Sequence, residues 1–497
     1  MTANTHSNNV ILYGRWERPR SSGLFGRTWG ETLFAGGVIV SVILLRLFTN
    51  SWPLALTVLT IGVAIFIPLI IRRNGRSGLE LIAMRFQFWK GARKGENIYA
   101  GGVFGVIPGA ARMPGIQGDT RLYEYELRNG DRFGLIHAKA RDHYSVFLDA
   151  QPQGQERVEQ WQINAWVHNW DLFLANLGTV QGLVGCVVVI ESVPDNGYRV
   201  REEVKRLVDP AAPEYAKRVM METATERVSA RVRNEVRIQL TFSRQRSADS
   251  AEVADQGAAI GRVLSSIVDR AVAAGLSART ISAADLCVAA ARAYRPELTR
   301  ELEAMAGAGE HGDLRWDMVG PRGCKGEWDS FVHNGYRSVT WEMSAAPAGT
   351  VAHDTLLPLL APRADLEHKR VAVVYRPHGI ADAVRMVDAD FKDALAAEQA
   401  KTGVGSAAAS LRVDNTRAAR QEQARGAGLT RFGLMVSLTA PRDADMPTLA
   451  AEVEGLGSAS RLTLQRMWGG QDSAFAGALG LGIVLPEYAS INRRVSA

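Results

Sequence analysis

Two long apolar stretches near the N-terminus interrupt a chain that otherwise alternates hydrophobic and polar positions. Leu33–Phe48 (LFAGGVIVSVILLRLF) contains a single charge, Arg46, and Trp52–Ile71 (WPLALTVLTIGVAIFIPLII) contains none. At about 1.5 Å per helical residue the second stretch covers about 30 Å, which matches the hydrocarbon core of a bilayer. Only three residues separate the two stretches. The pattern therefore predicts two transmembrane helices joined by a tight turn.

Cations flank both outer ends of this hairpin, and their positions predict its orientation. Before the first stretch and after the second lie Arg15, Arg18, Arg20, Arg27, Arg72, Arg73, Arg76, Arg85, Lys90, Arg93 and Lys94. The connecting turn carries no cation. Because Lys and Arg accumulate on the cytoplasmic side of membrane helices, we expect a protein of the cell (inner) membrane with both termini in the cytoplasm.

Five residues are expected to anchor the hairpin at the two membrane surfaces. Trp29 and Trp52 are placed at opposite interfaces, where aromatic rings accumulate, and the long side chain of Arg46 can reach the headgroups. Arg72 and Arg73 mark the inner end of the second span. Two alternatives stay open, a cleaved signal peptide and a hairpin buried in a soluble core. No small-x-small cleavage pattern follows the first stretch, and soluble helices of this length rarely lack charge.

The segment directly after the hairpin, Leu79–Lys94 (LELIAMRFQFWKGARK), has the pattern of an amphipathic helix. Leu79, Ile82, Phe86 and Trp89 follow one another at spacings of three to four residues, as on one helical face. Such a helix could lie on the inner leaflet, with its cations near anionic headgroups. It could equally pack on the next domain, and the sequence favours neither.

From about Gly101 the chain has the character of a soluble domain, beginning with the Gly- and Pro-rich linker Gly101–Gly118. Strands are predicted over 121–127, 133–138, 144–150, 180–193, 237–243, 337–343, 369–375, 433–439 and 461–465. Helices are predicted over 155–177, 213–234, 251–275, 283–305, 380–401, 410–425 and 446–456. The segment 410–425 is nearly all polar, which is typical of a solvated helix; a mobile arm and a partner-facing element are alternatives.

This alternation predicts an α+β protein in which a transmembrane hairpin precedes a cytoplasmic α/β body with two related lobes. We divide the chain into an N-terminal segment (1–28), the hairpin (29–71), a juxtamembrane helix and linker (72–118), a first lobe (119–310) and a second lobe (311–497). No clear sequence repeat relates the two lobes.

The net charge of +6 is distributed unevenly and does not point to nucleic acid. Residues 1–100 carry 12 Lys or Arg and 4 Glu, a net of +8, whereas the remainder carries 46 basic and 48 acidic residues, a net of −2. The basic excess is therefore a topology signal. Direct handling of DNA by residues 101–497 would require salt-dependent binding, which their charge disfavours. Protein partners are expected instead.

Motifs of nucleotide and dinucleotide binding are either missing from the sequence or lack the preceding strand that such sites require. The segment 320–325 (GPRGCK) has the wrong spacing for a phosphate-binding loop and no hydroxyl after its lysine. Gly307, Gly309 and Gly312 form a G-x-G-x-x-G pattern, but it follows a helix-like stretch rather than a strand. We expect no cofactor.

Hydrolase and metal motifs are equally absent from the sequence. Cys186, Cys287 and Cys324 lack C-x-x-C spacing, and neither H-E-x-x-H nor G-x-S-x-G occurs. A Cys nucleophile paired with a distant His, such as His137 or His143, stays open. We expect a non-enzymatic protein without catalytic or metal-binding residues.

Trp161, Trp166 and Trp170 lie at spacings of five and four residues in a predicted helix. Such large aromatic residues usually pack in a core. They also anchor protein interfaces, so these three are the candidate partner surface. Stacking on single-stranded nucleic acid is disfavoured by the neighbouring acidic residues Glu156, Glu159 and Asp171.

The order of these parts resembles a membrane component of actinobacterial conjugation and type IV secretion-like clusters. The opening YGRWERPRSSGLFGRTWGETLF resembles that family's entry to the membrane, and the hairpin is similar to small PrgI-like membrane subunits. The region from His143 to Val193, which begins HYSVFLDAQPQGQERVEQWQINAWVHNW, and the closing GGQDSAFAGALGLGIVLP resemble the N-terminal, non-motor part of the conjugation ATPase. The sequence departs from the family in lacking a phosphate loop and in stopping at Ala497, where a motor would begin.

The resemblance implies a non-enzymatic inner-membrane subunit that anchors or docks a separate cytoplasmic ATPase. Expected partners are that ATPase, other membrane subunits and the lipid bilayer, in an oligomeric complex. One alternative is a type VII secretion membrane subunit, which also has two N-terminal spans. Another is a membrane-tethered enzyme of unknown type.

Overall fold

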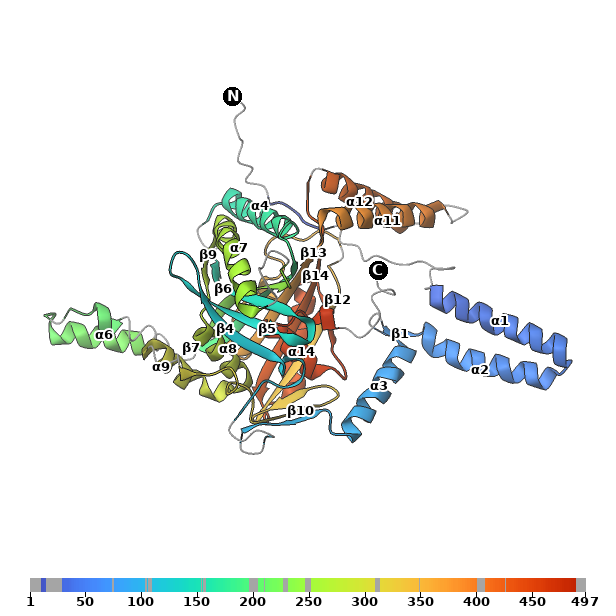
Figure 1. The fold of residues 1–497 in the computed structure, drawn as a ribbon, viewed down its shortest axis with the longest axis horizontal. Helices are drawn as coiled ribbons and strands as arrows, with labels where there is room; N and C mark the ends of the chain where they lie inside the picture. The colour runs from blue at the N-terminus through green and yellow to red at the C-terminus, as the bar shows by residue number, and fades with distance from the viewer. Residues whose placement is uncertain are drawn as a thin grey trace, which may run out of the picture.

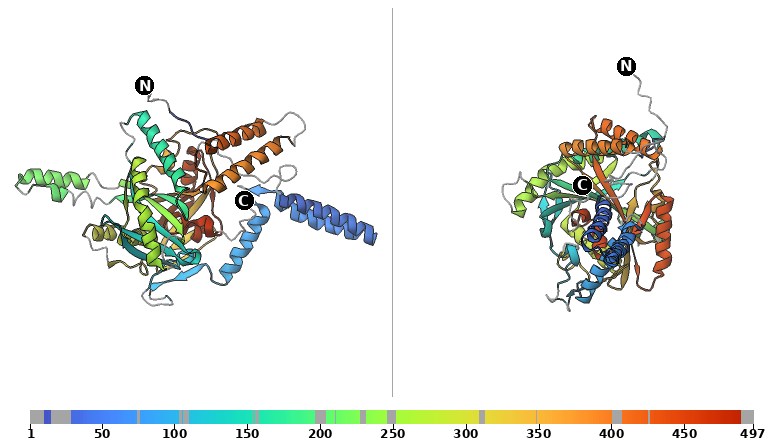
Figure 2. Two further views of the ribbon diagram at one scale, coloured as in Figure 1. Left: turned by 45° about the horizontal axis from the view of Figure 1, so that its top comes forward. Right: turned by 90° about the vertical axis from the view of Figure 1, so that its right-hand side faces the viewer.

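The computed structural model of the 497-residue chain has a large sheet body from which a helical hairpin projects (Figures 1 and 2). It describes residues 10–14, 29–73, 76–102, 105, 110–152, 154, 158–195, 204–209, 211–226, 231–245, 252–308, 313–347, 349–399, 407–424 and 426–488. The fold is α+β, as predicted: two apolar N-terminal helices precede a mixed body built on an antiparallel sheet.

Both predicted apolar stretches are helical. The hairpin consists of α1 (Trp29–Thr49) and α2 (Trp52–Ile70). A short two-stranded turn, β1 (Arg72–Arg73) and β2 (Arg76–Ser77), connects it to α3 (Gly78–Arg93).

Among the described residues, thirteen strands form one sheet in which every pairing is antiparallel. Their order is β3-β10-β11-β12-β14-β13-β7-β8-β6-β5-β4, with β15 added on β12 and β9 on β6. The strands are β3 (Ile98–Ala100), β4 (Thr120–Glu126), β5 (Arg132–Ala138), β6 (His143–Pro152), β7 (Leu183–Asp195), β8 (Arg231–Ser243), β9 (Leu276–Thr280), β10 (Gly323–Gly326), β11 (Phe331–His333), β12 (Tyr336–Ala345), β13 (His368–Pro377), β14 (Thr430–Pro441) and β15 (Thr463–Arg466).

The strand order repeats on the two sides of the central β7–β13 pair. One side runs β7-β8-β6-β5 and the other β13-β14-β12-β11, and β9 pairs with β6 as β15 pairs with β12. A buried hydroxyl pair recurs as well: Ser145 Oγ lies 2.8 Å from Thr241 Oγ1, and Ser338 Oγ lies 2.8 Å from Thr439 Oγ1. The two halves therefore share a topology although their sequences differ. The domain boundary at 310/311 stays a prediction, since both ranges contribute to one sheet.

Helices cover both faces of the sheet, because successive strand residues point to opposite sides and both sets are apolar. One face packs on α4 (Gln160–Leu177), α7 (Val253–Ala273), α10 (Leu357–Leu360) and α13 (Met446–Ala459). The other packs on α8 (Ala283–Tyr294), α9 (Thr299–Ala308) and α14 (Gln471–Ala478). The pattern is clear in β5, where Leu135 belongs to the first core and Ile136 to the second.

Two helical insertions extend from the sheet (Figure 1). The helix α6 (Glu214–Glu226) follows β7, and the pair α11 (Ile380–Gln399) and α12 (Ala407–Ala424) connects β13 to β14. The polar segment 410–425 thus forms most of α12, which packs against α11: Arg420 Nε lies 2.8 Å from Asp388 Oδ1, and Val413 is buried.

Several predicted element boundaries are wrong. The helix predicted over 213–234 ends earlier, because β8 already begins at Arg231. The helix predicted over 283–305 is interrupted after Tyr294, since Pro296 disfavours a helical Arg295, which has φ −133° and ψ 72°. Short elements such as β9, β10 and α14 were not predicted, because their few residues carry no periodicity.

A stretch without regular structure after α14 runs through the body's core. Leu479, Leu481, Ile483 and Val484 are fully buried there. Distant side chains supply the hydrogen bonds that this backbone lacks: Arg237 Nη2 donates to Leu479 O (2.6 Å), Gln117 Nε2 donates to Leu481 O (3.1 Å), and Gly482 N donates to Gln239 Oε1 (2.9 Å). Because buried polar backbone groups need such partners, these side chains make the path possible.

Candidate membrane anchor and surfaces of the body

The hairpin exposes apolar side chains over most of its surface. Two windows meet the length and composition of membrane spans, Thr32–Thr49 and Trp52–Leu69, and they are 0% and 11% buried inside the protein. Figure 1 shows the hairpin extending away from the sheet rather than lying on it. A helix that is hydrophobic all round normally has an apolar environment. These are therefore two candidate membrane-spanning helices, and the buried soluble hairpin is not what the structure forms.

The two helices of the hairpin pack closely at one glycine. A Cβ on Gly62 would lie 2.5 Å from Val38 Cγ1, and the rings of Phe34 and Phe66 stack with centroids 6.4 Å apart. Gly36 has no described atom within 4 Å of its Cβ position. Close approach therefore depends on Gly62, as small residues allow in membrane helices.

The tip of the hairpin brings together two of the predicted anchoring residues. The Arg46 guanidinium donates a hydrogen bond to the Asn50 side chain, and its Cζ lies 4.8 Å from the centroid of the Trp52 ring. A cation over an aromatic ring suits a membrane interface. The structure places the other three at the opposite end, Trp29 as the first residue of α1 and Arg72 and Arg73 in β1. The anchoring roles of all five stay predictions.

A segment before the first span touches the sheet body. Tyr13 forms an isolated bridge with Val351, with N–H···O distances of 2.8 and 2.7 Å in the two directions. Residues 10–14 and the body therefore lie at the same end of the hairpin, as expected when two antiparallel helices are joined by a tight turn. Arg15, Arg18, Arg20 and Arg27, used above for the orientation, lie outside the described residues.

The base of the hairpin joins α3 through a compact turn. Gly78 N donates to Ile71 O (2.9 Å), and a Cβ on Gly78 would lie 2.9 Å from Pro68 O. Ser77 and Glu80 form a reciprocal cap, with Ser77 N to Glu80 Oε2 at 2.8 Å and Glu80 N to Ser77 Oγ at 3.2 Å. The start of α3 is thus held against the last turn of α2.

One face of α3 packs on the body. Phe88 meets the Trp328 ring edge to face at 5.5 Å between centroids, and Arg85 Cζ lies 4.7 Å from the same ring. Asn97 Nδ2 donates to Gly326 O (2.7 Å) just after the helix, and β3 then joins the sheet. The alternative in which this helix packs on the next domain is therefore correct for this face. Its opposite face is exposed.

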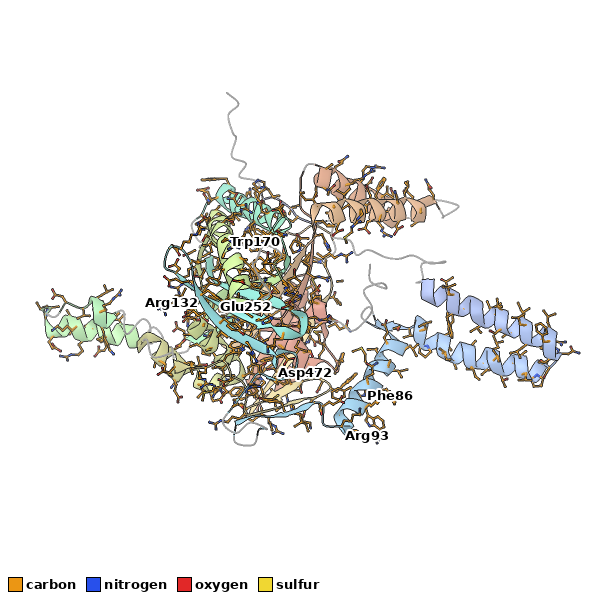
Figure 3. The ribbon with its side chains drawn as sticks, viewed as in Figure 1. Phe86, Arg93, Arg132, Trp170, Glu252 and Asp472 are labelled. Carbon is orange, nitrogen blue, oxygen red and sulfur yellow. The ribbon has the colours of Figure 1, made fainter. Side chains whose placement is uncertain are left out.

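The three tryptophans of α4 differ in their surroundings. Trp170 stacks on Phe173 at 5.0 Å between centroids and belongs to the border of the core (Figure 3). Trp166 lies over Gly275, where a Cβ would come within 2.5 Å of its ring and where φ is +83°. Trp161 is 38% exposed. The core interpretation holds for Trp170, whereas Trp166 is half-buried against Gly275. A partner contact through the series stays a prediction.

A buried ionic cluster lies where the two halves of the sheet meet. Arg370 on β13 contacts Glu191 on β7 (Nε–Oε1 3.0 Å), and Arg292 on α8 contacts Glu191 (3.3 Å) and Glu235 (2.6 Å). Arg237 Nη2 lies 4.0 Å from Glu191 Oε2. Burial alone would raise the pKa of Glu191, but the three guanidiniums outweigh it and hold that pKa well below its usual range. The cluster joins β7, β8, β13 and α8. Sequence reasoning missed it because its residues are far apart in the chain.

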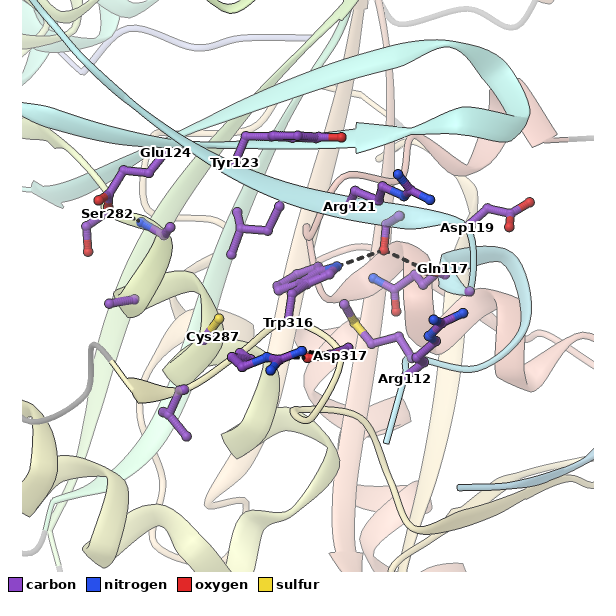
Figure 4. A pocket seen from close by; sticks show the side chains of 18 of the residues that line it. Arg112, Gln117, Asp119, Arg121, Tyr123, Glu124, Ser282, Cys287, Trp316 and Asp317 are labelled. Atoms are coloured by element: carbon purple, nitrogen blue, oxygen red, sulfur yellow. Dashed lines mark hydrogen bonds and ion pairs between the residues drawn. The ribbon is translucent and has the colours of Figure 1, made fainter. Parts of the chain in front are cut away.

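The body also contains a pocket of about 1010 Å³ beside β4 (Figure 4). Its wall has cations (Arg112, Arg121, Arg132, Lys139, Arg315) and carboxylates (Asp119, Glu124, Asp317). Trp316 Nε1 donates to Thr120 Oγ1 (3.1 Å), which donates to Gln117 O (2.6 Å). Arg315 Nη2 lies 2.8 Å from Asp317 Oδ2. The side chains of its wall thus hold one another in place.

Among the described residues, no group of three or more His, Cys, Asp or Glu side chains could hold a metal ion. Cys324 lies opposite His333 in the β10–β11 pair, but both ring nitrogens of His333 already have partners, Tyr294 O at 2.9 Å and Ser338 Oγ at 2.9 Å. Cys186, Cys287 and Cys324 are free thiols, all buried, and burial raises each pKa to about 12, which disfavours the nucleophilic thiolate. His137 Nε2 lies 3.1 Å from Asp142 Oδ1, and its ring stacks on Tyr144.

Comparison with known proteins found one matching family model, whose description gives no function. A family model described as a domain of unknown function (DUF8461) matches residues 20–80, which covers the hairpin and the start of α3. No curated protein matches the chain.

Proposed function

We propose that this chain is a membrane-anchored, non-enzymatic subunit that presents its body as a docking platform at the cytoplasmic face of the cell (inner) membrane. The observation that carries the proposal is the exposed, apolar hairpin, joined to a large body by a fixed turn. The contact between Tyr13 and Val351 supports one common side for residues 10–14 and the body. The cations after the second span favour the cytoplasm as that side.

The finer assignment is a subunit of a conjugation or type IV secretion-like apparatus that anchors or docks a separate ATPase. It rests on the resemblance of the hairpin and body sequences, including the closing segment that crosses the core. A type VII secretion subunit is the alternative with the same two-span arrangement.

The anchor is tested by alkaline carbonate extraction of membranes together with reporter fusions at residue 497. We expect the protein to remain in the pellet and the reporter to be active only in its cytoplasmic form. Release by carbonate would contradict the anchor, and a reporter active outside the cytoplasm would overturn the orientation.

The partner is tested by co-purification of the full chain from detergent-solubilised membranes. We expect an ATPase to co-purify, less of it with Trp161→Ala, and unchanged amounts with Met318→Ala, which removes an exposed apolar side chain on the other side of the sheet. Reproducible absence of any ATPase from the purified sample would contradict the docking role.

The pocket beside β4 favours one rival, a membrane-tethered enzyme or binding protein for an anionic molecule, because cations outnumber carboxylates on its wall. Arg121→Ala discriminates the two. A docking platform should keep its partner and its transport activity in this variant, whereas loss of transport with partner binding intact would favour the rival.

A further inference from the structure

We propose that α3 is an interfacial helix whose exposed face lies in the headgroup region of an anionic cytoplasmic leaflet, so that the body is held directly against the membrane. The inference deepens the proposed function and rests on the hairpin spanning the bilayer. It assigns lipid as the partner of a surface that the body leaves open.

The position of α3 places it at the level where the second span leaves the bilayer. The hydrogen bond from Gly78 N to Ile71 O and the close approach of Gly78 to Pro68 O hold its first turn against the end of α2. From there α3 runs across the axis of the hairpin rather than continuing it (Figures 1 and 2). A helix in this position meets the membrane surface along its length.

The two long faces of α3 have different surroundings. Phe88, on the body side, packs on Trp328. On the other side Ile82, Phe86 and Trp89 are 59%, 60% and 46% exposed, and the rings of Phe86 and Trp89 lie 6.0 Å apart. Figure 3 shows Phe86 on the side of α3 that faces away from the sheet. A contiguous apolar stripe of this kind marks a binding surface, and the helix that carries it begins against the end of α2.

The cations beside the apolar stripe favour an anionic leaflet as its binding partner. Arg93 Cζ lies 3.6 Å above the Trp89 ring, so a cation and an interfacial aromatic residue occupy the same end of the stripe. Lys90 is exposed next to Trp89. Basic residues near a cytoplasmic leaflet are attracted to its anionic lipids. A surface that binds a protein partner would not need to lie beside the membrane spans.

The test uses the full chain reconstituted into vesicles of phosphatidylcholine with phosphatidylglycerol and carrying one nitroxide label. Ile82→Cys places the label in the stripe, and Gln87→Cys places it at an exposed polar position on the flank of the same helix. Ile61→Cys, in the middle of α2, reports on the span itself. The labelled native chain measures any background from its three buried cysteines. Accessibility to oxygen and to a water-soluble nickel chelate gives the depth of each label.

We expect the label at 82 to be several-fold less accessible to nickel than the label at 87, and more accessible to oxygen. Combining Lys90→Glu and Arg93→Glu with Ile82→Cys should restore nickel access at 82 while the label at 61 stays in lipid. Equal nickel access at 82 and 87 would overturn the inference and leave the anchor intact. Low access to both reagents at 82 would mean a protein neighbour and would also overturn it. Nickel access at 61 would overturn the anchor itself.

Discussion

The hairpin and the sheet body are built from the same apolar residue types, yet they accommodate charge in opposite ways. The hairpin keeps cations at its ends, with Arg46 turned onto Trp52 at the tip, and leaves its middle without any. The body buries Glu191 completely and surrounds it with Arg370, Arg292 and Arg237. A folded core can supply counter-ions at fixed positions, whereas lipid cannot. The difference agrees with the proposed lipid surroundings of the hairpin and with the folded interior of the body.

The largest effect is expected from breaking the body's ionic cluster. Glu191→Gln leaves Arg370 buried without its counter-ion, which costs about 3–5 kcal/mol when one partner of a buried pair is removed. Chemical unfolding of the purified chain, followed by tryptophan fluorescence, measures the loss. Arg279→Gln is the control: it breaks an exposed pair with Asp149 (2.8 Å) and should cost less than about 1 kcal/mol. Equal losses in the two variants would contradict the distinction.

A charge placed inside the hairpin should have the next largest effect. Ile61→Asp puts a carboxylate in the middle of α2, at a cost of about 2.5–3.5 kcal/mol for insertion, because no counter-ion is near. The fraction of protein resistant to carbonate extraction should fall sharply, while Ile61→Leu should behave as the native chain. If Ile61→Asp were retained as well as Ile61→Leu, the apolar surface of α2 would not be facing lipid.

Acidification should weaken the body and leave the hairpin unaffected. Burial lowers the pKa of His333 to about 4 and that of His368 to about 3; His368 also faces Arg370, Arg292 and Glu191. Between these values and the usual value of about 6.5 the unfolded chain binds more protons than the folded one. The contribution of these two histidines to the free energy of unfolding should thus be largest above about pH 6.5 and should fall as the pH decreases toward 4.

Thermal unfolding at pH 7.5 and pH 5 measures this dependence. His333→Gln and His368→Asn should each make it shallower, even where the substitution itself lowers the stability. If the midpoint temperature of unfolding of the native chain did not change with pH, the two histidines could not be buried and neutral.

The smallest effect is expected inside the hairpin's own packing. Gly62→Ala places a methyl group 2.5 Å from Val38 Cγ1 and should push the two helices apart slightly. Oxidative cross-linking of a Phe34→Cys, Phe66→Cys chain reports the spacing, since the native rings stack at 6.4 Å. We expect a lower yield with Gly62→Ala and an unchanged yield with Gly36→Ala, whose Cβ would meet no described atom.

Prediction from the sequence was most successful where the signal is local. An uninterrupted apolar run specifies a helix of membrane length by itself, and α1 and α2 match the two predicted stretches. Alternating residues likewise predicted β4, β5 and β6 to within a few residues. The helix predicted over 213–234 failed where α6 gives way to β8, because the partner strands, rather than the local pattern, decide the conformation of Arg231–Asn234.

For the candidate site, too, the sequence predicted the local features and missed those that depend on distant residues. Arg46 and Trp52 were each predicted to lie at a membrane surface, and the five residues between them include the turn that brings the two side chains together. The exposed tryptophan of α4 could not be told from the packed ones, because Trp166 meets Gly275 and Trp170 meets Tyr375, both more than a hundred residues away. The pocket beside β4 also combines segments distant in the chain.

The sequence by itself determined the two apolar helices, the cations at their outer ends and the α+β character of the body, because each depends on residues close together in the chain. The tertiary structure decided which face of α3 the body covers, how the closing segment crosses the core, and that Glu191 and Arg370 meet at the centre of one sheet. These features depend on contacts between residues far apart in sequence. Their free energies are decided by burial and by available partners, which no local pattern records.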